Sequence, residues 1–498
     1  MMGIRWKILG FFLLILPEVL IGEEEVTYKY VDSLTYHFYQ EQQWDSLIMV
    51  GKLALSHQID YYYLRVRMGI AEFRRERYIP AHHHFEKALQ FDSYSQTAKS
   101  YRYYSLINAA KRKQAFRLSR GFTDAEKKKE DIRLPLVDHL LLLGGYSFAN
   151  NENRNGQQTL VEPDHPLGKQ LLMGNMMLGS AGFAFNLSPS ASLQLNFTSE
   201  RVYKIDRFQY FLRSHSREKR VIGQNGSYIN DFKEIPLLDE STFSSLIHQS
   251  ELYLHPSIQL DHGLAFGLFA NLLFINLNQY AGRLVPVFRE DTARYNAFTG
   301  EYTKIILEES QFNASQSDTS FFNFLTGLYV SRDYGYVSFE LSGSYAKLYN
   351  IEQWQADVLL TYFPLGNLNF YGTTGLAYYQ TAGTTNLESP SRLLFHQILG
   401  VRLWKPIWLE GEFRTGNLNN THIRRGLVVF NLPDDINYIG GLKISFYAGD
   451  HLSLFFRYDY AHKTGYYINS DPMEEANQQV YTFDYQTQNI IGGLQWTF

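Results

Sequence analysis

The feature that most restricts the fold is a period-two alternation in the last stretch of the chain, residues 481–498. Ile490, Gly492, Trp496 and Phe498 fall on one face, and the other face is mostly polar or small. Successive side chains of a β-strand point to opposite faces, so this pattern predicts a strand with one apolar and one wet face. A single strand of this kind fits a soluble sandwich as well as a membrane barrel.

With the last stretch included, the alternation occurs in fourteen segments, and this repetition favours the barrel. The expected strands are 138–148, 170–187, 191–203, 246–260, 263–279, 319–332, 335–348, 353–364, 367–380, 391–405, 407–417, 436–448, 451–467 and 482–498. Tight turns alternate with longer polar loops, which are expected at 149–169, 204–245, 280–318, 381–390, 418–435 and 468–481. Alternating long and short connections on an even number of strands are typical of outer-membrane barrels. We therefore expect a 14-stranded antiparallel transmembrane β-barrel over 135–498, with its tight turns in the periplasm.

Charged residues alternate with apolar ones within several of these strands. A charged side chain cannot face lipid cheaply, so these residues are expected to face the lumen. The lumen-facing set is Glu340, Arg402, Glu410, Glu412, Arg414, Lys443, Arg457 and Asp459. Two roles fit them equally: they line a conduction path, or they form a neutralising ladder that holds a narrow barrel together.

The composition agrees with a barrel and argues against several other classes. Aromatic residues make up 16% of the chain, with 37 Tyr and 36 Phe, as expected for two aromatic girdles. The net charge of −4 does not indicate a nucleic-acid partner, and the absence of cysteine excludes disulfides, a thiolate metal site and a lipidated N-terminal cysteine.

Sequence motifs of catalysis are missing. There is no Gly-x-Ser-x-Gly elbow, no His-Glu-x-x-His and no phosphate-binding glycine-rich loop. His255, His396 and His422 are isolated in sequence and read as structural residues. We expect a protein that is not an enzyme and that needs no cofactor or metal.

The first 22 residues predict a secretory signal peptide. Arg5 and Lys7 precede an apolar run over 8–16, which Pro17 interrupts before the Gly22–Glu23 junction. A membrane anchor is the alternative, but the run is shorter than the roughly 20 apolar residues that a spanning helix needs.

Residues 23–120 predict a helical domain, because two copies of one pattern lie 34 residues apart. The second copy approximates the tetratricopeptide pattern, in which small residues let two antiparallel helices nest. The residues expected to pack the repeats are Tyr39, Trp44, Ala54, Gly69, Phe73, Tyr78, Ala81, Phe85 and Ala88. The stretch from Ser95 to about Leu118 is expected to form a capping helix. The solenoid either binds a peptide or partner protein, or serves as a plug or spacer.

Two polar stretches of this region invite sharper interpretations. His82, His83 and His84 are adjacent, so on a helix they point about 100° apart and cannot converge on one metal ion. Residues 111–133 hold nine Lys or Arg against four Asp or Glu. This stretch, including a basic linker at 121–134, is either solvated or rests on phospholipid headgroups.

The ending Gly493-x-x-Trp496-x-Phe498 resembles the C-terminal assembly signal of bacterial outer-membrane barrels, which implies the barrel assembly machinery and outer-membrane lipids as partners. A signal peptide, a short periplasmic tetratricopeptide region and a 14-stranded barrel together resemble the surface lipoprotein assembly modifiers. That resemblance implies export or surface delivery of a protein or lipoprotein client that the helical domain recruits. The poly-N-acetylglucosamine exporters share the combination but have more repeats and a wider pore. Polysaccharide export, or an adhesive role of the long loops without transport, are the alternatives.

Overall fold

A computed structural model describes residues 26–150, 159–162, 165–222, 225–228, 235–298, 301–382, 391–471 and 474–498. The predicted signal peptide lies outside these residues. The chain forms two compact units that divide between Arg102 and Tyr103, so the packing boundary falls earlier than residue 120. Each unit is described by itself.

The helices of the chain begin at a regular interval. Their bounds are α1 Tyr28–Gln40, α2 Trp44–Ser56, α3 Tyr62–Arg74, α4 Tyr78–Phe91, α5 Gln96–Asn108, α6 Arg112–Leu118 and α7 Asp124–Lys129. α1, α3 and α5 start 34 residues apart, and so do α2, α4 and α6. The turns keep the same interval, because Gln42, Glu76 and Ala110 all adopt left-handed backbone angles, with φ of 56°, 57° and 57°. The spacing thus continues into a third helix pair where a single capping helix was expected.

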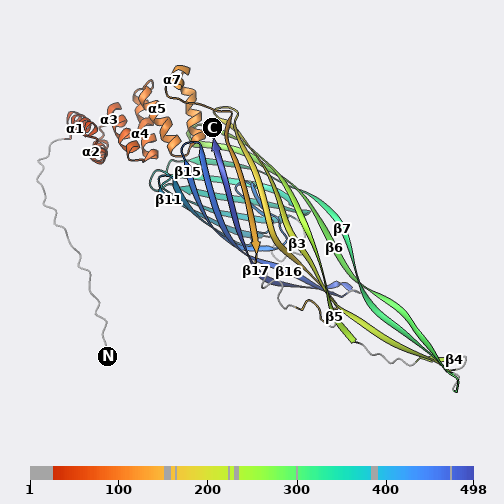
Figure 1. Cartoon of the computed structure of the whole chain (residues 1–498). Helices are drawn as coiled ribbons and strands as arrows, with labels where there is room; N and C mark the ends of the chain where they lie inside the picture. Colours follow the sequence, from red (N-terminus) through yellow and green to blue (C-terminus); the bar gives the residue numbers. More distant parts are fainter. Residues whose placement is uncertain are drawn as a thin grey trace, which may run out of the picture. The chain divides into compact units, whose positions relative to one another are not determined.

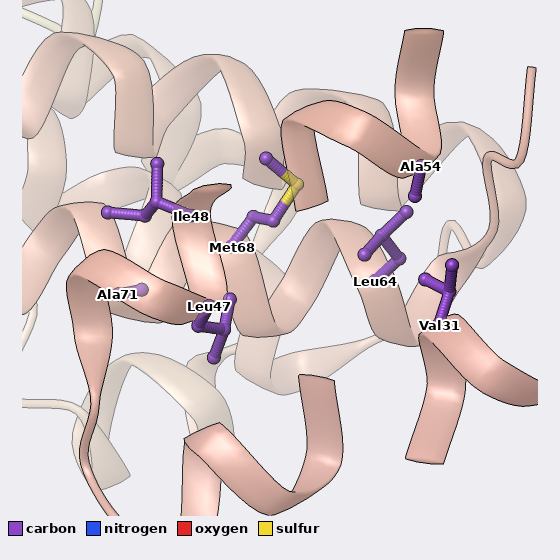
Figure 2. Close-up of a cluster of buried hydrophobic side chains, with 7 residues drawn as sticks. All are labelled: Val31, Leu47, Ile48, Ala54, Leu64, Met68 and Ala71. Carbon is purple, nitrogen blue, oxygen red and sulfur yellow. The ribbon is translucent and has the colours of Figure 1, made fainter. Parts of the chain in front are cut away.

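The first unit is held together by small apolar clusters between successive helices. One cluster joins Val31 of α1, Leu47, Ile48 and Ala54 of α2, and Leu64, Met68 and Ala71 of α3 (Figure 2). Gly69 of α3 faces the ring of Phe85 in α4, so closely that a Cβ there would lie 2.8 Å from the ring. Close approach of two helices requires such a small residue. Among the described helices, none has the length and apolar character needed to cross a membrane.

The second unit is built around a closed antiparallel β-barrel. In the described part of the chain its fourteen strands are β1 Val137–Ala149, β2 Leu167–Asn186, β3 Ala191–Ile222, β5 Ile235–Gln259, β6 Leu264–Asn296, β7 Glu301–Asp333, β8 Val337–Leu348, β9 Ile351–Tyr362, β10 Phe370–Ala382, β11 Ser391–Trp404, β12 Ile407–Thr415, β15 Asp435–Ala448, β16 Leu452–Asp471 and β17 Glu474–Thr497. Each of these strands pairs with the barrel strands before and after it in the sequence, and β1 pairs with β17 to close the sheet. The predicted fold class is confirmed.

The predicted turns at one end of the barrel are short in the structure. β7 and β8 are joined through Tyr334–Tyr336, and β11 and β12 through Lys405–Pro406. At the opposite end, Tyr349 and Asn350 join β8 to β9 with φ of 49° and 65°. Two left-handed residues in a two-residue hairpin match the right-handed twist of the strands.

Four barrel strands continue far beyond the others. The prediction of loops at 204–245 and 280–318 is therefore wrong, because most of these residues belong to the four long strands. β3, β5, β6 and β7 form an arm at the end opposite the tight turns (Figure 1). β6 has 33 residues and spans roughly 110 Å, whereas the 12-residue β8 spans roughly 40 Å.

The base of the arm has its own aromatic core. The described ladder between β5 and β6 ends at the His248–Asn276 pair, after which the β3–β5 and β6–β7 ribbons continue side by side. Further out, β3 pairs with β7 from Ser214–Glu309 to Ile222–Glu301. Tyr210 stacks on Phe312 with ring centroids 4.3 Å apart, and Phe243 stacks on Tyr280 at 4.8 Å. The two ribbons therefore pack on each other through aromatic side chains.

The outside of the barrel is apolar. Large exposed hydrophobic residues occur on every side of it, among them Leu142, Phe183, Phe197, Leu252, Leu268, Leu328, Leu341, Val358, Leu376, Leu399, Leu442 and Phe456. In β16, Leu454, Phe456 and Tyr458 are exposed while Asp459 is buried. An apolar exterior and a polar interior define a barrel that spans a lipid bilayer.

Candidate functional site in the barrel lumen

A segment of the chain crosses the inside of the barrel. Residues 416–434, between β12 and β15, contain the short hairpin of β13 Thr421–Ile423 and β14 Val428–Phe430. We call this the inner segment. It contacts β5 to β9, which lie on other parts of the barrel wall. The predicted polar loop at 418–435 is thus folded into the lumen, and its apolar residues Leu427 and Val429 pack on inward-facing Phe269 and Leu325.

Polar contacts fix the inner segment to the wall. The guanidinium of Arg425 donates to both carboxylate oxygens of Glu340, at 2.8 and 2.5 Å. Its Cζ also lies 3.7 Å from the ring centroid of Tyr329. The imidazole Nε2 of His422 lies 2.6 Å from the hydroxyl of Ser344, and its main chain exchanges two hydrogen bonds with the Gln355 amide. Charge-assisted bidentate bonds with cation–π stacking define one position for the segment.

The backbone at the tip of the inner segment is in an unusual conformation. Arg424, Arg425 and Gly426 all have left-handed φ angles, of 53°, 57° and 76°. This region costs a residue other than glycine about 1 kcal/mol or more, so the surrounding contacts must hold it. The Gly426 carbonyl accepts from the amide of Asn271, which is fully buried.

Beside this tip, four of the predicted lumen charges, Glu412, Arg414, Arg457 and Asp459, form one cluster. Glu412 accepts from Arg414 and, at 2.7 Å, from Nη1 of Arg457. Nε2 of His396 lies 2.8 Å from the same carboxylate, and Arg457 also binds Asp459 at 2.8 Å. These charges therefore form a compact ion-pair network on β11, β12 and β16.

The remaining predicted lumen charges are placed separately. Lys443 donates to Glu410 at 2.5 Å, and Glu340 is engaged by Arg425 of the inner segment. Arg402 lies near the tight-turn end, with its guanidinium 5.6 Å from the ring centroid of Trp408. Both proposed roles of these charges, lining a conduction path and neutralising one another, stay predictions. Most of the predicted lumen charges form ion pairs in the described residues.

On the opposite wall, two carboxylates are held by amides. Gln249 donates to Glu251 at 2.6 Å and to Glu200 at 3.4 Å, while Asn271 donates to the other oxygen of Glu251 at 2.9 Å. Asn431 of the inner segment donates to Gln249 at 2.8 Å. This chain of hydrogen bonds is a second attachment of the inner segment.

α6 lies across the tight-turn end of the barrel. Lys111 binds Asp333 at 2.6 Å and donates to the Gly335 carbonyl at 2.9 Å. Burial lowers the pKa of Lys111, and the charge of Asp333 opposes this shift. The Lys111–Asp333 pair is about nine-tenths buried, and its two opposite charges offset the cost of that burial.

The same short helix reaches three further points of the rim. Arg112 binds Asp138 at 3.0 Å, and Arg117 binds Asp261 at 2.7 Å. Lys113 donates to the hydroxyl of Ser257 at 3.0 Å. The expectation of a solvated stretch is therefore wrong for Lys111 to Arg117, because their charges are bound to strand ends and turns.

The residues expected to pack the helical repeats are largely buried. Ala54, Ala81, Phe85 and Ala88 have no exposed surface. The other positions make ring contacts or close approaches: Tyr39 with Trp44, Phe73 with Tyr78 and Tyr101, and Gly69 with Phe85.

The predicted assembly signal closes the barrel. Gly493 and Trp496 of β17 pair with Leu143 and Leu140 of β1, and the Phe498 amide donates to the Asp138 carbonyl at 3.0 Å. Trp496 and Phe498 are exposed on the outside. Their role in assembly is a prediction that rests on this position.

Sequence reasoning missed the inner segment and the docking of α6. The partners of Arg425 and Lys111 lie 85 and 222 residues away in sequence, and neither pairing leaves a periodic pattern. The available signals were weak: two adjacent arginines before a glycine in a polar loop, and basic residues that recur along one short helix.

The fold and its surface define the class: a 14-stranded transmembrane β-barrel with its own inner segment. No protein-family model matches this chain, and no curated protein matches it.

Solved structures with some likeness include a Pseudomonas aeruginosa FadL homologue, with 8% identity, coverage of 72% of this chain and 90% of that one, and a TM-score of 0.38. The Pseudomonas putida toluene transporter TodX has 7% identity, coverage of 73% and 91%, and a TM-score of 0.34. A structure of MamA has 19% identity, coverage of 22% of this chain and 61% of that one, and a TM-score of 0.19. These low scores carry no argument about function.

Proposed function

We propose that this chain is an outer-membrane barrel that exports a protein client or delivers it to the cell surface, with the helical unit recruiting the client in the periplasm. One observation carries the proposal. The inner segment occupies the lumen, and α6, which lies across the tight-turn end, continues the 34-residue series of the helices. A barrel for free diffusion does not need buried ion pairs that keep its lumen closed, whereas a gated carrier needs contacts that close the lumen between transport events.

A surface on α1 and α3 is our candidate for client binding. Tyr36 and Tyr63 are 48% and 60% exposed, and both rings lie within 6 Å of the Arg67 guanidinium, at 5.1 and 5.8 Å. We call this the tyrosine patch. Exposed aromatic side chains beside an arginine are typical of sites that bind protein partners. Helix pairs at this spacing, if tetratricopeptide-like, serve mostly as binding platforms.

The test compares cells that carry the full chain with cells that carry a Tyr36→Ala/Tyr63→Ala variant. Surface-exposed outer-membrane proteins are removed from intact cells by protease and quantified by mass spectrometry. We expect at least one protein to leave the surface in the variant while barrel abundance stays unchanged. Tyr94→Ala, an 87% exposed tyrosine outside the patch, is the control. An unchanged set of surface proteins in cells that lack the whole chain would rule out delivery.

The arm supports a second candidate, an adhesive or contact role at the cell surface. Its aromatic core stabilises two ribbons well beyond the membrane. Shortening both ribbons at the paired positions Phe211–Leu238 and Val285–Gln311 tests it. Loss of cell attachment with normal surface proteins would favour this role over delivery.

A further inference from the structure

One stretch of the arm has a strand edge without a ladder. β7 pairs with β6 along one edge, from Arg332 in the barrel wall to Glu301 near the tip of the arm (Figure 1). On its other edge, β3 pairs with residues 301–309 and β8 with residues 324–333. Between these two ladders, no strand of the described chain pairs with β7. The last residues before β8 contact the β8–β9 turn, so we call residues 310–320 the open edge.

The backbone groups of the open edge can be assigned to their sides. In the turn after β7, the Tyr334 amide donates to the Val337 carbonyl at 2.8 Å, in register with the β7–β8 ladder. Tyr334 therefore directs its backbone toward β8. Backbone direction alternates along a strand, and the β6 ladder runs from Arg332 to Ile305 without a register shift. Even-numbered residues of the open edge thus direct their amide and carbonyl groups away from β6: Ser310, Phe312, Ala314, Gln316, Asp318 and Ser320.

The open edge has little protection against pairing with another strand. Strand edges are usually protected by charged side chains, proline, bulges or a covering segment. Residues 310–320 contain no proline, glycine or basic residue and one carboxylate, Asp318. All six residues from Asn313 to Asp318 are exposed. By contrast, the edges of β5 and β6 that lose their mutual ladder in the arm are joined by the stacked rings of Phe243 and Tyr280.

The geometry of the edge argues against a second copy of this chain as its occupant. Antiparallel pairing centred on Ser315 would bring the partner's residues 301–309, with β3 attached, against β8. Two copies in one membrane would pair in parallel about a two-fold axis, with identical residues at equal height. A parallel ladder cannot form between residues that both point at each other at equal height.

A single extended segment of another protein meets neither obstacle. The gap between the β3 and β8 ladders spans roughly 45 Å, enough for about ten residues of a strand. The open edge starts where β8 ends, at the barrel end opposite the tight turns. A segment that leaves the lumen at this end emerges beside it.

We propose that the open edge binds an extended segment of a partner protein by strand addition, and that the partner is the exported client. In strand addition, main-chain hydrogen bonds supply affinity and alternate side chains supply selectivity. The side chains along the edge are mostly amides and hydroxyls with one carboxylate, so a segment without acidic residues fits it. Only the naming of the client as partner rests on the proposed delivery function.

Peptide binding to the detergent-solubilised full-length protein tests the proposal without transport. The probe is a fluorescent, uncharged peptide of eleven residues that alternates valine with threonine or glutamine. We expect saturable binding by fluorescence anisotropy, and slower hydrogen exchange at the amides of Phe312, Ala314, Gln316 and Asp318. The same peptide with prolines at two adjacent central positions should not bind, because it lacks ladder donors on both of its edges.

A proline variant locates the site. Gln316→Pro removes an amide that faces the open edge and leaves the β6 ladder intact, so the strand should tolerate it. Peptide binding should weaken about tenfold, because one hydrogen bond is lost and the ring obstructs the incoming strand. Gln316→Ala keeps the amide and should bind as the wild type. Heat-modifiable mobility checks that both variants fold.

The proposal is overturned if the wild type does not bind the peptide, or if folded Gln316→Pro binds it as tightly as the wild type. Should Gln316→Pro not fold, hydrogen exchange of the wild type decides: protection that leaves the four named amides unchanged overturns the proposal.

The comparison of surface proteins in intact cells, repeated with Gln316→Pro, separates this site from the delivery function. Fewer delivered proteins at the surface than with Gln316→Ala support the client as the partner. Normal delivery by Gln316→Pro overturns the client as partner and leaves the delivery function standing.

Discussion

At the residue scale, the direction and depth of a side chain in the barrel wall decide what it tolerates. Leu442 is 48% exposed on the outside and lies six residues from the turn that ends β15. Leu454 is also exposed but lies two residues from the start of β16. A charge on the lipid face costs most at the bilayer midplane and little near the interface.

We therefore expect Leu442→Arg to lower the free energy of unfolding by about 2–4 kcal/mol, and Leu454→Arg by about 0–1 kcal/mol. Denaturant unfolding of barrels inserted in lipid vesicles measures both. Equal losses for the two variants would mean that the assumed depth of these strands is incorrect.

A buried histidine should make the helical unit sensitive to acid. His84 of α4 is 9% exposed, and burial lowers its pKa to about 3, with the nearby Arg65 charge adding to the shift. The folded state keeps His84 neutral, while the unfolded chain takes up a proton below about pH 6.5. Stability is therefore present above pH 6.5 and is lost as the pH falls toward 3.

The loss between pH 7 and pH 5 should be about 2 kcal/mol. Thermal loss of the helical circular-dichroism signal of the full chain, recorded at both pH values, measures it. His84→Gln should flatten the dependence, whereas His37→Gln, on the last turn of α1, should not. A pH-independent transition in the wild type would contradict a neutral buried His84.

At the element scale, α6 should be held mainly by its most buried ion pair. The side chains of Lys111 and Asp333 are 10% and 11% exposed, whereas Asp261, the partner of Arg117, is 72% exposed. Lys111→Ala leaves a buried carboxylate short of its cation, which costs up to about 3 kcal/mol. Arg117→Ala removes a pair that water screens, so its effect should be smaller.

Hydrogen exchange of the amides between residues 112 and 121 reports how often α6 leaves the rim. Exchange should rise strongly in Lys111→Ala, weakly in Arg117→Ala and not at all in Arg133→Ala. The reverse order would place the main attachment elsewhere.

The inner segment should be what closes the lumen. Replacing residues 418–433 by a short glycine–serine linker removes the Arg425–Glu340 and His422–Ser344 contacts together. We expect the full chain to conduct little in planar bilayers and the shortened barrel to conduct several-fold more. Equal conductance would show that α6 or the wall side chains alone close the barrel.

Local patterns in the sequence predict each strand but not how long connections fold. The fourteen barrel strands could be predicted from the period-two alternation and from the turn residues, because both are local features of the sequence. The arm was predicted as loops because polar stretches such as Asn313 to Asp318 carry no apolar face. The inner segment was predicted as a surface loop because its partners, such as Gln249 for Asn431, are far away in sequence.

At the scale of the whole molecule, the division into two units predicts where the chain can be cut. Residues 103–498 include α6 with its four rim attachments, so this piece should insert and keep its lumen closed. A cut at residue 134 removes α6 and leaves Asp333 and Asp138 without their partners.

Heat-modifiable mobility and bilayer conductance of the two pieces test this prediction. The longer piece should insert and conduct as little as the full chain, and the shorter one should insert and conduct more. Failure of residues 103–498 to insert would mean that the first unit is needed for assembly. If the tyrosine patch recruits a client, neither piece should restore surface delivery.

The constant 34-residue interval of the helices has a consequence for how such a chain can change in evolution. Gln42, Glu76 and Ala110 mark the same point in three successive units of the series, and the last unit supplies Lys111 and Arg112. Duplication or deletion of one whole unit upstream alters the length of the helical series but leaves the rim contacts untouched. Insertions of any other length would break the phase between turn and helix, so lineages are expected to vary in steps of complete repeats.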